Sequence, residues 1–340
     1  MRTKTARAFD AIFGGLAALF LASGTALAGS WNMPTPYPSG SFHTQNVEQF
    51  AADVRSETDG AVNIVVHPAG SLVKHAEIKN AVRSGQVQIG EFLLSRLSNE
   101  NPVFEADAVP FLADSYDASR ALWAAQRPVV EEQLARQNLT VLYAVPWPPQ
   151  GLYSRTQLDT LSALAGMRFR TYNAATERFA QLAGAMPTQV EVPDIPQAFA
   201  TGRVAGMITS STTGVNSKAW DYLSHYTDTR AFLPKNIIVV NTNALDVLDA
   251  SDRAAILQAA KRAEERGWAM SMAETDKQTH ALGDNGLVVS EPSASLRADL
   301  SRIGEQMTRE WVARAGTAGT DLLTRFEEER SKTVDAVQSN

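Results

Sequence analysis

The sequence predicts an α/β protein with two lobes, and three observations support that prediction. Short apolar runs alternate with amphipathic helical stretches over residues 29–92, and the alternation returns over residues 167–209, as in parallel strands joined by helical crossovers. The chain has 340 residues, whereas a single hydrophobic core stops growing at about 250 to 300 residues. Residues 251–282 contain no proline, and a helix there would be ~48 Å long, enough to brace both lobes.

The first lobe is predicted to begin with a βαβαβ unit. Residues 42–58 carry apolar side chains at helical spacing, and residues 61–66 are rich in β-branched side chains, which favour strands. A glycine follows each predicted helix, where its freedom at positive φ suits a helix end. The unit comprises strands 30–35, 61–66 and 87–90 and helices 42–58 and 74–84.

A stiff segment follows a predicted helix at 117–137 and a strand at 140–144. Residues 145–150 are Val-Pro-Trp-Pro-Pro-Gln, and three prolines in four positions exclude a helix or a central strand because proline lacks a backbone N–H. We therefore expect this segment to cross between the lobes. The second half is predicted as strands 167–171, 188–191, 204–209 and 237–241, helices 174–182, 195–201 and 251–282, and C-terminal helices 294–312 and 321–337.

Residues 1–28 have the pattern of a cleaved secretory signal. Three basic residues in the first seven positions precede an apolar stretch at 11–22, and Ala26-Leu27-Ala28 supplies a small-x-small cleavage site. The apolar stretch is shorter than the ~20 residues that cross a bilayer. We expect a periplasmic protein that starts at Gly29. Its lobe I would comprise 29–148 plus about 235–265, and lobe II 149–234 plus about 266–340, including the C-terminal helices.

Composition and missing motifs exclude several classes of function. Without cysteine there is no thiolate nucleophile, iron–sulfur cluster or Cys-ligated zinc, and no lipid-bearing N-terminal cysteine. The net charge of −6 becomes −8 once residues 1–28, with three basic groups and one acidic group, are removed, which argues against a nucleic-acid partner. The mature chain has no phosphate loop and no HExxH, GxSxG or GxGxxG motif, and its five histidines lack metal-ligand spacing. We expect no cofactor, no metal and no catalysis.

Three spaced elements carry a resemblance to a known family: residues 164–173, LAGMRFRTYN, then 184–187, GAMP, then 197–206, QAFATGRVAG. With the turn at 68–72 and Val-Pro-Phe-Leu at 109–112, they resemble the periplasmic solute-binding proteins of TRAP transporters, the DctP-like family, over about residues 30–285. The resemblance implies a two-lobe periplasmic-binding-protein architecture with interlobe hinge strands and a long helix spanning both lobes. It also implies hinge closure over a small organic acid.

Arg170 is the candidate anchor for a carboxylate. The resemblance implies this role, because Arg170 matches the arginine that the family places on the strand after a Gly-x-basic-x-Arg turn. A guanidinium forms two parallel charge-assisted hydrogen bonds with a carboxylate and stays charged in a closed cleft. From the residues alone an internal ion pair is equally open, since Arg168 lies on the same strand face. Arg168 itself is expected to be a charge at the lobe edge.

Glu91 ends the third predicted strand, where some relatives present a ligand-contacting glutamate. It either receives a hydroxyl or ammonium group of the ligand or pairs with Arg170 in an empty cleft. If Glu91 and Arg170 both face the cleft, a hydroxy or amino acid is favoured and a dicarboxylate is repelled.

Asn173, Thr209 and Ser210 lie at the carboxyl ends of predicted strands, where ligands bind in open α/β sheets. Asn173 either caps helix 174–182 or offers its amide to the ligand, and the two hydroxyls either bind the ligand or cap the following turn. Many relatives carry an aspartate at the position of Ala205, so the detailed geometry of this lobe stays open.

Five further candidates are aromatic or amide side chains near the predicted cleft. Trp147 either walls the cleft or packs the hinge. Gln150 stands where many sugar-acid-binding relatives have a second arginine, so we expect a single strong carboxylate anchor. Tyr37 either contacts the ligand or anchors a buried loop, and Phe232 and Asn236 either wall the cleft or shape the hinge.

These features together predict a monomeric, periplasmic solute-binding protein of a TRAP transporter. It would capture a hydroxy-, keto- or amino-substituted monocarboxylate by hinge closure and deliver it to the membrane subunits. The alternatives are a receptor for a small amine or polar solute built around Glu91, and a periplasmic enzyme on the same two-lobe scaffold.

Overall fold

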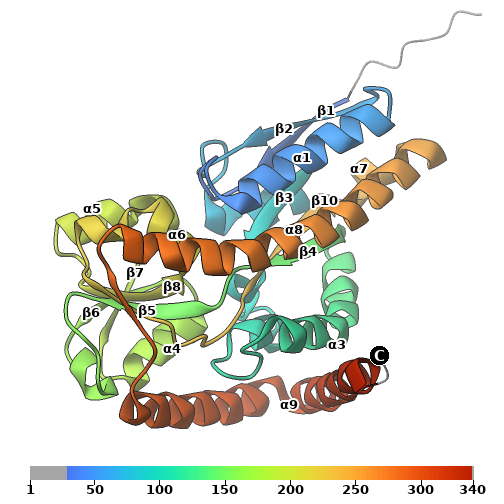
Figure 1. Ribbon diagram of the computed structural model, residues 1–340. Helices are drawn as coiled ribbons and strands as arrows, with labels where there is room; N and C mark the ends of the chain where they lie inside the picture. Colours follow the sequence, from blue (N-terminus) through green and yellow to red (C-terminus); the bar gives the residue numbers. More distant parts are fainter. Residues whose placement is uncertain (1–28, 339–340) are drawn as a thin grey trace, which may run out of the picture.

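The computed structural model describes residues 29–338, and the signal expected at residues 1–28 lies outside them. Figure 1 shows two α/β lobes side by side, joined by extended segments and by the long helix α8. The predicted α/β class and two-lobe architecture are therefore confirmed. Within the described residues, no helix combines the length and apolarity needed to cross a membrane.

Lobe I is built on two small sheets. β1 pairs in parallel with β2, and β10 lies between β3 and β4 and is antiparallel to both. Every residue of β10 is buried, as its run of Ile and Val requires. The elements of this lobe are β1 (Gly29–Pro34), α1 (Phe42–Glu57), β2 (Val62–His67), α2 (Ile78–Arg83), β3 (Ile89–Leu93), α3 (Tyr116–Ala135), β4 (Leu139–Pro146) and β10 (Lys235–Asn241).

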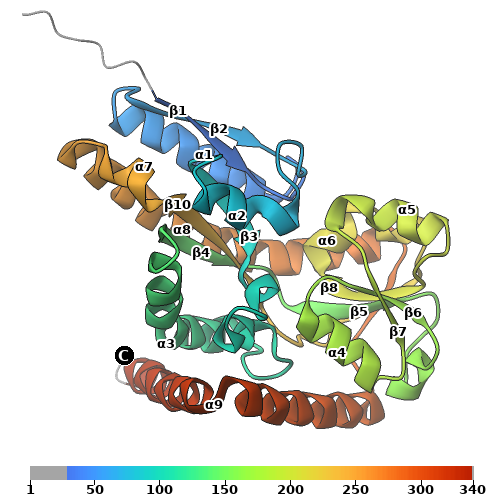
Figure 2. The ribbon, with the colours of Figure 1, turned by 180° about the vertical axis from the view of Figure 1, so that it is seen from behind.

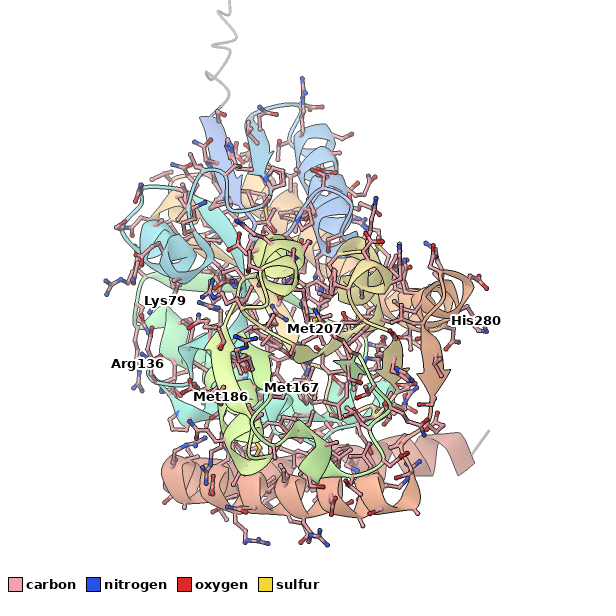
Figure 3. The ribbon with its side chains drawn as sticks, turned by 90° about the vertical axis from the view of Figure 1, so that its left-hand side faces the viewer. Lys79, Arg136, Met167, Met186, Met207 and His280 are labelled. Carbon is pink, nitrogen blue, oxygen red and sulfur yellow. The ribbon has the colours of Figure 1, made fainter. Side chains whose placement is uncertain are left out.

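Lobe II is a six-stranded sheet in the order β11-β9-β5-β8-β6-β7. Met186 of β7 is half-exposed and Met207 of β8 is fully buried, as expected for an edge and an interior strand; both are labelled in Figure 3. The predicted strand 188–191 lies two residues earlier, at β7. The elements are β5 (Gln150–Ser154), β6 (Arg168–Thr171), α4 (Ala174–Leu182), β7 (Met186–Gln189), α5 (Ile195–Ala200), β8 (Gly206–Ser210), α6 (Ser211–Asn216), β9 (His225–Thr227) and β11 (Val288–Ser290).

Two extended segments run together between the lobes and form the hinge. The N–H of Trp147 donates to the carbonyl of Pro234 at 2.8 Å, and the N–H of Gln150 donates to that of Phe232 at 3.0 Å. The N–H of Ala231 returns a bond to the carbonyl of Gln150 at 2.9 Å. The proline-rich segment is thus the first crossing, and residues 231–235 form the second.

A single helix braces both lobes on one side. α8 (Ala250–Asp284), preceded by the short α7 (Thr242–Asp246), packs against α1 and β4 in lobe I and against α6 and β11 in lobe II. Gly267 of α8 allows close approach, because a Cβ there would clash with Val145 and lie 2.7 Å from Asn46 Nδ2. The predicted long helix is confirmed.

The chain ends in α9 (Ala294–Gln338), which runs beneath both lobes in Figures 1 and 2. Two helices were expected here, and they are joined across a kink at Gly316, whose φ of 58° suits glycine. α9 packs against α3 and also against α4, so it contacts both lobes, whereas the sequence places it in lobe II. The exact lobe boundaries stay a prediction.

Candidate ligand-binding site

A cavity lies between the two lobes, over the hinge. The lobe I side is lined by Tyr37, His75, Leu93 and Arg96, and the hinge contributes Trp147, Gln150 and Pro234. The lobe II side is lined by Arg170, Tyr172, Glu191, Val192, Thr209 and Thr213. Five of the ten candidate residues therefore line one cavity: Tyr37, Trp147, Gln150, Arg170 and Thr209.

Arg170 extends from β6 and is almost fully buried, with 2% of its surface exposed. Its Nε donates to the carbonyl of Val190 at 2.9 Å, and its guanidinium lies 4.7 Å from the ring centre of Tyr172. Burial lowers the pKa of Arg170, although a guanidinium remains charged at neutral pH. Among the described residues, Arg170 forms no ion pair, so the internal pair considered from sequence is not observed. Arg168 is exposed, as expected.

Tyr37 and Trp147 form an aromatic wall that is fixed by one amide. The Tyr37 hydroxyl and the Trp147 Nε1 both donate to Asn236 Oδ1, at 2.9 and 3.0 Å. The two rings meet edge to face with their centres 4.9 Å apart. Asn236 itself does not line the cavity, so it holds the wall from behind.

Glu91 is fully buried behind this wall and does not line the cavity. Asn236 Nδ2 donates to its Oε1 at 2.9 Å, and Thr35 donates to its Oε2. His43 Nδ1 lies 3.4 Å from Oε1, and burial lowers the pKa of His43. The structure supports neither alternative for Glu91, the ligand contact or the ion pair with Arg170: among the described residues its partners lie within lobe I and at Asn236, and its side chain does not line the cavity.

Gln150 lines the cavity and is held at both ends of its amide. Its Oε1 accepts from the Tyr172 hydroxyl at 3.1 Å, and its Nε2 donates to the carbonyl of Pro148 at 2.7 Å. Phe232 is buried and meets Gln150 through its backbone carbonyl without lining the cavity, so it shapes the hinge.

Two of the polar candidates are helix caps. Asn173 Oδ1 accepts from the N–H of Thr176 at 2.8 Å and begins α4, and Ser210 Oγ accepts from the N–H of Thr213 at 3.1 Å and begins α6. Neither lines the cavity, whereas Thr209 and Thr213 do. Asn173 Nδ2 also donates to Ser95 Oγ at 2.8 Å, a hydrogen bond between the lobes.

A charged cluster that the sequence did not reveal closes the cavity between the lobes. Glu191 follows β7 in lobe II, and its Oε1 accepts from Arg96 of lobe I at 2.9 Å. Its Oε2 lies 3.2 Å from His75 Nδ1, which carries the proton because His75 Nε2 accepts from the N–H of Leu93 at 3.2 Å. Burial would raise the pKa of Glu191, but His75 and the arginines lower it to about 2. The only signal was the position of Glu191 beyond a strand parallel to β6.

Comparison with known proteins identifies the family. The profile of the DctP family, described as bacterial extracellular solute-binding protein, family 7, matches residues 35–315. This chain belongs to that family. The predicted family is thus confirmed, and the protein is a solute receptor of the TRAP type.

Three solved structures resemble this chain closely, each with a TM-score of 0.87 and each covering 88% of it. The Bordetella pertussis receptors DctP7 and DctP6 are 43% and 39% identical, and all of each chain is covered. A TRAP solute-binding protein from a marine metagenome is 36% identical, with 99% of it covered. Each of the three is described as binding pyroglutamic acid or pyroglutamate.

Proposed function

We propose that this protein is the TRAP receptor for pyroglutamate or a closely similar small cyclic monocarboxylate. The observation that carries the proposal is Arg170, a buried guanidinium in the cavity between the lobes that has no ion-pair partner among the described residues. A guanidinium held in this way favours one carboxylate bound through two parallel hydrogen bonds. The relatives described as binding pyroglutamate, at 36 to 43% identity, support the choice of ligand.

The remaining lining suits a small ring with polar edges. Tyr37 and Trp147 offer an apolar aromatic wall, and Gln150, Thr209 and Thr213 add hydrogen-bonding groups to the lining. A dissociation constant of about 1 μM corresponds to about −8 kcal/mol, which one charge-assisted pair, a few hydrogen bonds and a desolvated ring can supply. In pyroglutamate, the ring amide would take the place of the hydroxy, keto or amino group that the sequence predicts for the ligand.

The receptor would work by closing its lobes over the ligand and delivering it to the membrane subunits of the transporter. We place it in the periplasm after removal of residues 1–28 and propose that it acts as a monomer without a nucleic-acid partner. The small-amine alternative is less well supported, because Glu91, its intended anchor, lies behind the aromatic wall.

The decisive experiment is a thermal-shift and calorimetry screen with pyroglutamate, L-proline, lactate, 2-oxobutyrate and small amines. Pyroglutamate should stabilise the protein by about 2.7 kcal/mol at a hundredfold excess over its dissociation constant. Arg170→Ala should abolish that stabilisation while the empty variant stays folded, because the carboxylate loses its anchor. Full stabilisation of Arg170→Ala would refute the anchor, and a response to amines alone would refute the ligand class.

The enzyme alternative is tested on the same sample. A receptor returns pyroglutamate unchanged after long incubation, whereas an enzyme converts it. Recovery of a new compound by mass spectrometry, absent from an Arg170→Ala control, would favour the enzyme.

A further inference from the structure

The charged groups that line the cavity sum to one positive charge. Two guanidiniums, of Arg170 and Arg96, face one carboxylate, of Glu191. His75 is neutral at pH 7 because burial lowers its pKa. Tyr37 and Tyr172 are also neutral, because burial raises the pKa of both hydroxyls.

Glu191 forms an ion pair with Arg96, so Arg96 is not available to bind a carboxylate of the ligand. Arg96 follows β3 in lobe I, its side chain is 13% exposed, and its Nη1 donates both to Glu191 Oε1 and to the carbonyl of Tyr172. Glu191 comes from lobe II, so this ion pair spans the cleft. Arg170 is left as the guanidinium without a carboxylate partner among the lining residues that the structure describes.

The other buried charged groups near the cleft do not line the cavity. Glu91 is bound by Thr35, Asn236 and His43 behind the aromatic wall. Lys235 Nζ and Asp107 Oδ2 lie 3.9 Å apart, and neither residue lines the cavity. The net charge of the side chains that line the cavity therefore depends on Arg170, Arg96 and Glu191.

We propose that Glu191 is a specificity-determining residue: by pairing with Arg96 across the closed cleft, it makes the receptor select ligands with one negative charge and reject dicarboxylates. The proposal rests on the proposed function of a carboxylate receptor. A second carboxylate in the closed cleft would lose its hydration without gaining a cationic partner and would face Glu191, which is costly. The repulsion that the sequence assigned to Glu91 thus belongs to Glu191.

The test measures a preference ratio, the dissociation constant of glutarate divided by that of pyroglutamate, by competition calorimetry. Glutarate brings two carboxylates on five carbons, and pyroglutamate brings one on a ring of similar size. In the wild type the ratio should be large. In Glu191→Gln the freed Arg96 raises the cleft charge by one unit, so the ratio should fall about tenfold, the effect of about 1.4 kcal/mol between charges at close range.

The double variant Arg96→Met/Glu191→Gln returns the cleft to one positive charge, so its ratio should return toward that of the wild type. Glu177→Gln, on an exposed face of α4 in the same lobe, is the matched control and should leave the ratio unchanged. A merely structural role for Glu191 would weaken both ligands equally and leave the ratio constant. If Glu191→Gln fails to fold, Arg96→Met alone should raise the ratio.

A wild type that binds glutarate as tightly as its monocarboxylate, or a ratio that Glu191→Gln does not change, would overturn the inference. An error in the proposed ligand can be distinguished from an error in the role of Glu191. If the wild type ignores pyroglutamate but binds another monocarboxylate from the screen, the proposed ligand is wrong, and the ratio is then measured with that acid.

Discussion

At the scale of single residues, the amide of Asn236 holds the aromatic wall of the cavity, although Asn236 does not itself line the cavity. Asn236 Oδ1 accepts hydrogen bonds from Tyr37 and Trp147, and Asn236 Nδ2 donates one to Glu91. The amide therefore joins the aromatic wall to a buried carboxylate. All four side chains are buried, so each lost bond would leave a polar group without a partner. The orientation of the wall therefore depends on a residue that does not line the cavity.

Replacing this amide should weaken both folding and binding. Asn236→Ala leaves the Tyr37 hydroxyl and the Trp147 Nε1 without an acceptor, so the free energy of unfolding in urea should fall by about 1 to 3 kcal/mol. Calorimetry with pyroglutamate should show weaker binding because the wall is no longer held. Asn243→Ala, at an exposed position of α7, is the control. Unchanged affinity in Asn236→Ala would show that the wall does not need this support.

At the scale of elements, the long helices α8 and α9 pack against both lobes. α8 approaches lobe I so closely at Gly267 that no side chain fits between it and Val145 of β4. Because β4 runs directly into the hinge, the position of α8 fixes where the hinge begins.

A side chain at Gly267 should therefore destabilise the protein. In an open helix Gly→Ala stabilises by about 1 kcal/mol, but here the added Cβ overpacks the contact with Val145 and Asn46, which costs about 1 to 3 kcal/mol. The melting temperature of Gly267→Ala should fall. Gly283→Ala, in the same helix with Val289 3.7 Å from the new Cβ, should raise it. A rise in both variants would contradict the close approach.

Periodic helices and strands with a buried run could be predicted from sequence, while short strands could not. The bounds of α4 match the expected helix because Asn173 supplies a cap signal directly before an amphipathic segment. β9 and β11 have three residues each and exist because of their neighbours in the sheet, which no local pattern reports. Cap residues such as Ser210 were ambiguous because a hydroxyl suits a ligand as well as a helix end.

In the candidate site, too, residues marked by a local sequence pattern could be predicted, whereas residues that only the tertiary structure brings together could not. Arg170 and Trp147 could be assigned to the cleft because a motif and a proline-rich crossing mark them. Arg96 and Glu191 come together only when the two lobes meet, so their pairing is a property of the tertiary structure. Glu91 was misassigned because the direction of a side chain at a strand end depends on the packing around it.

At the scale of the whole molecule, the lobes touch through polar contacts that form around the cavity. The Arg96–Glu191 pair and the Ser95–Asn173 hydrogen bond both join lobe I to lobe II. These are short-range contacts, so they exist only while the cleft is closed. We therefore expect the ligand to favour this arrangement over a more open one.

The chain has no cysteine, which makes closure measurable. In Ser95→Cys/Asn173→Cys the two thiols are the only ones in the protein, and they face each other across the cleft. A short bifunctional thiol reagent such as dibromobimane should crosslink them faster when pyroglutamate is present, because the ligand holds the lobes together. The single-cysteine variants serve as controls, and equal rates with and without ligand would argue against closure.

The hinge also forms part of the cavity surface. Trp147, Gln150 and Pro234 line the cavity, and backbone hydrogen bonds join the two segments to which they belong. A substitution at one of these positions would change both the affinity for the ligand and the stiffness of the hinge. Adaptation to a new solute through these positions would therefore also alter how the lobes close. Receptors that share this hinge should therefore change their ligand specificity through side chains on the lobes, where a substitution does not alter the hinge.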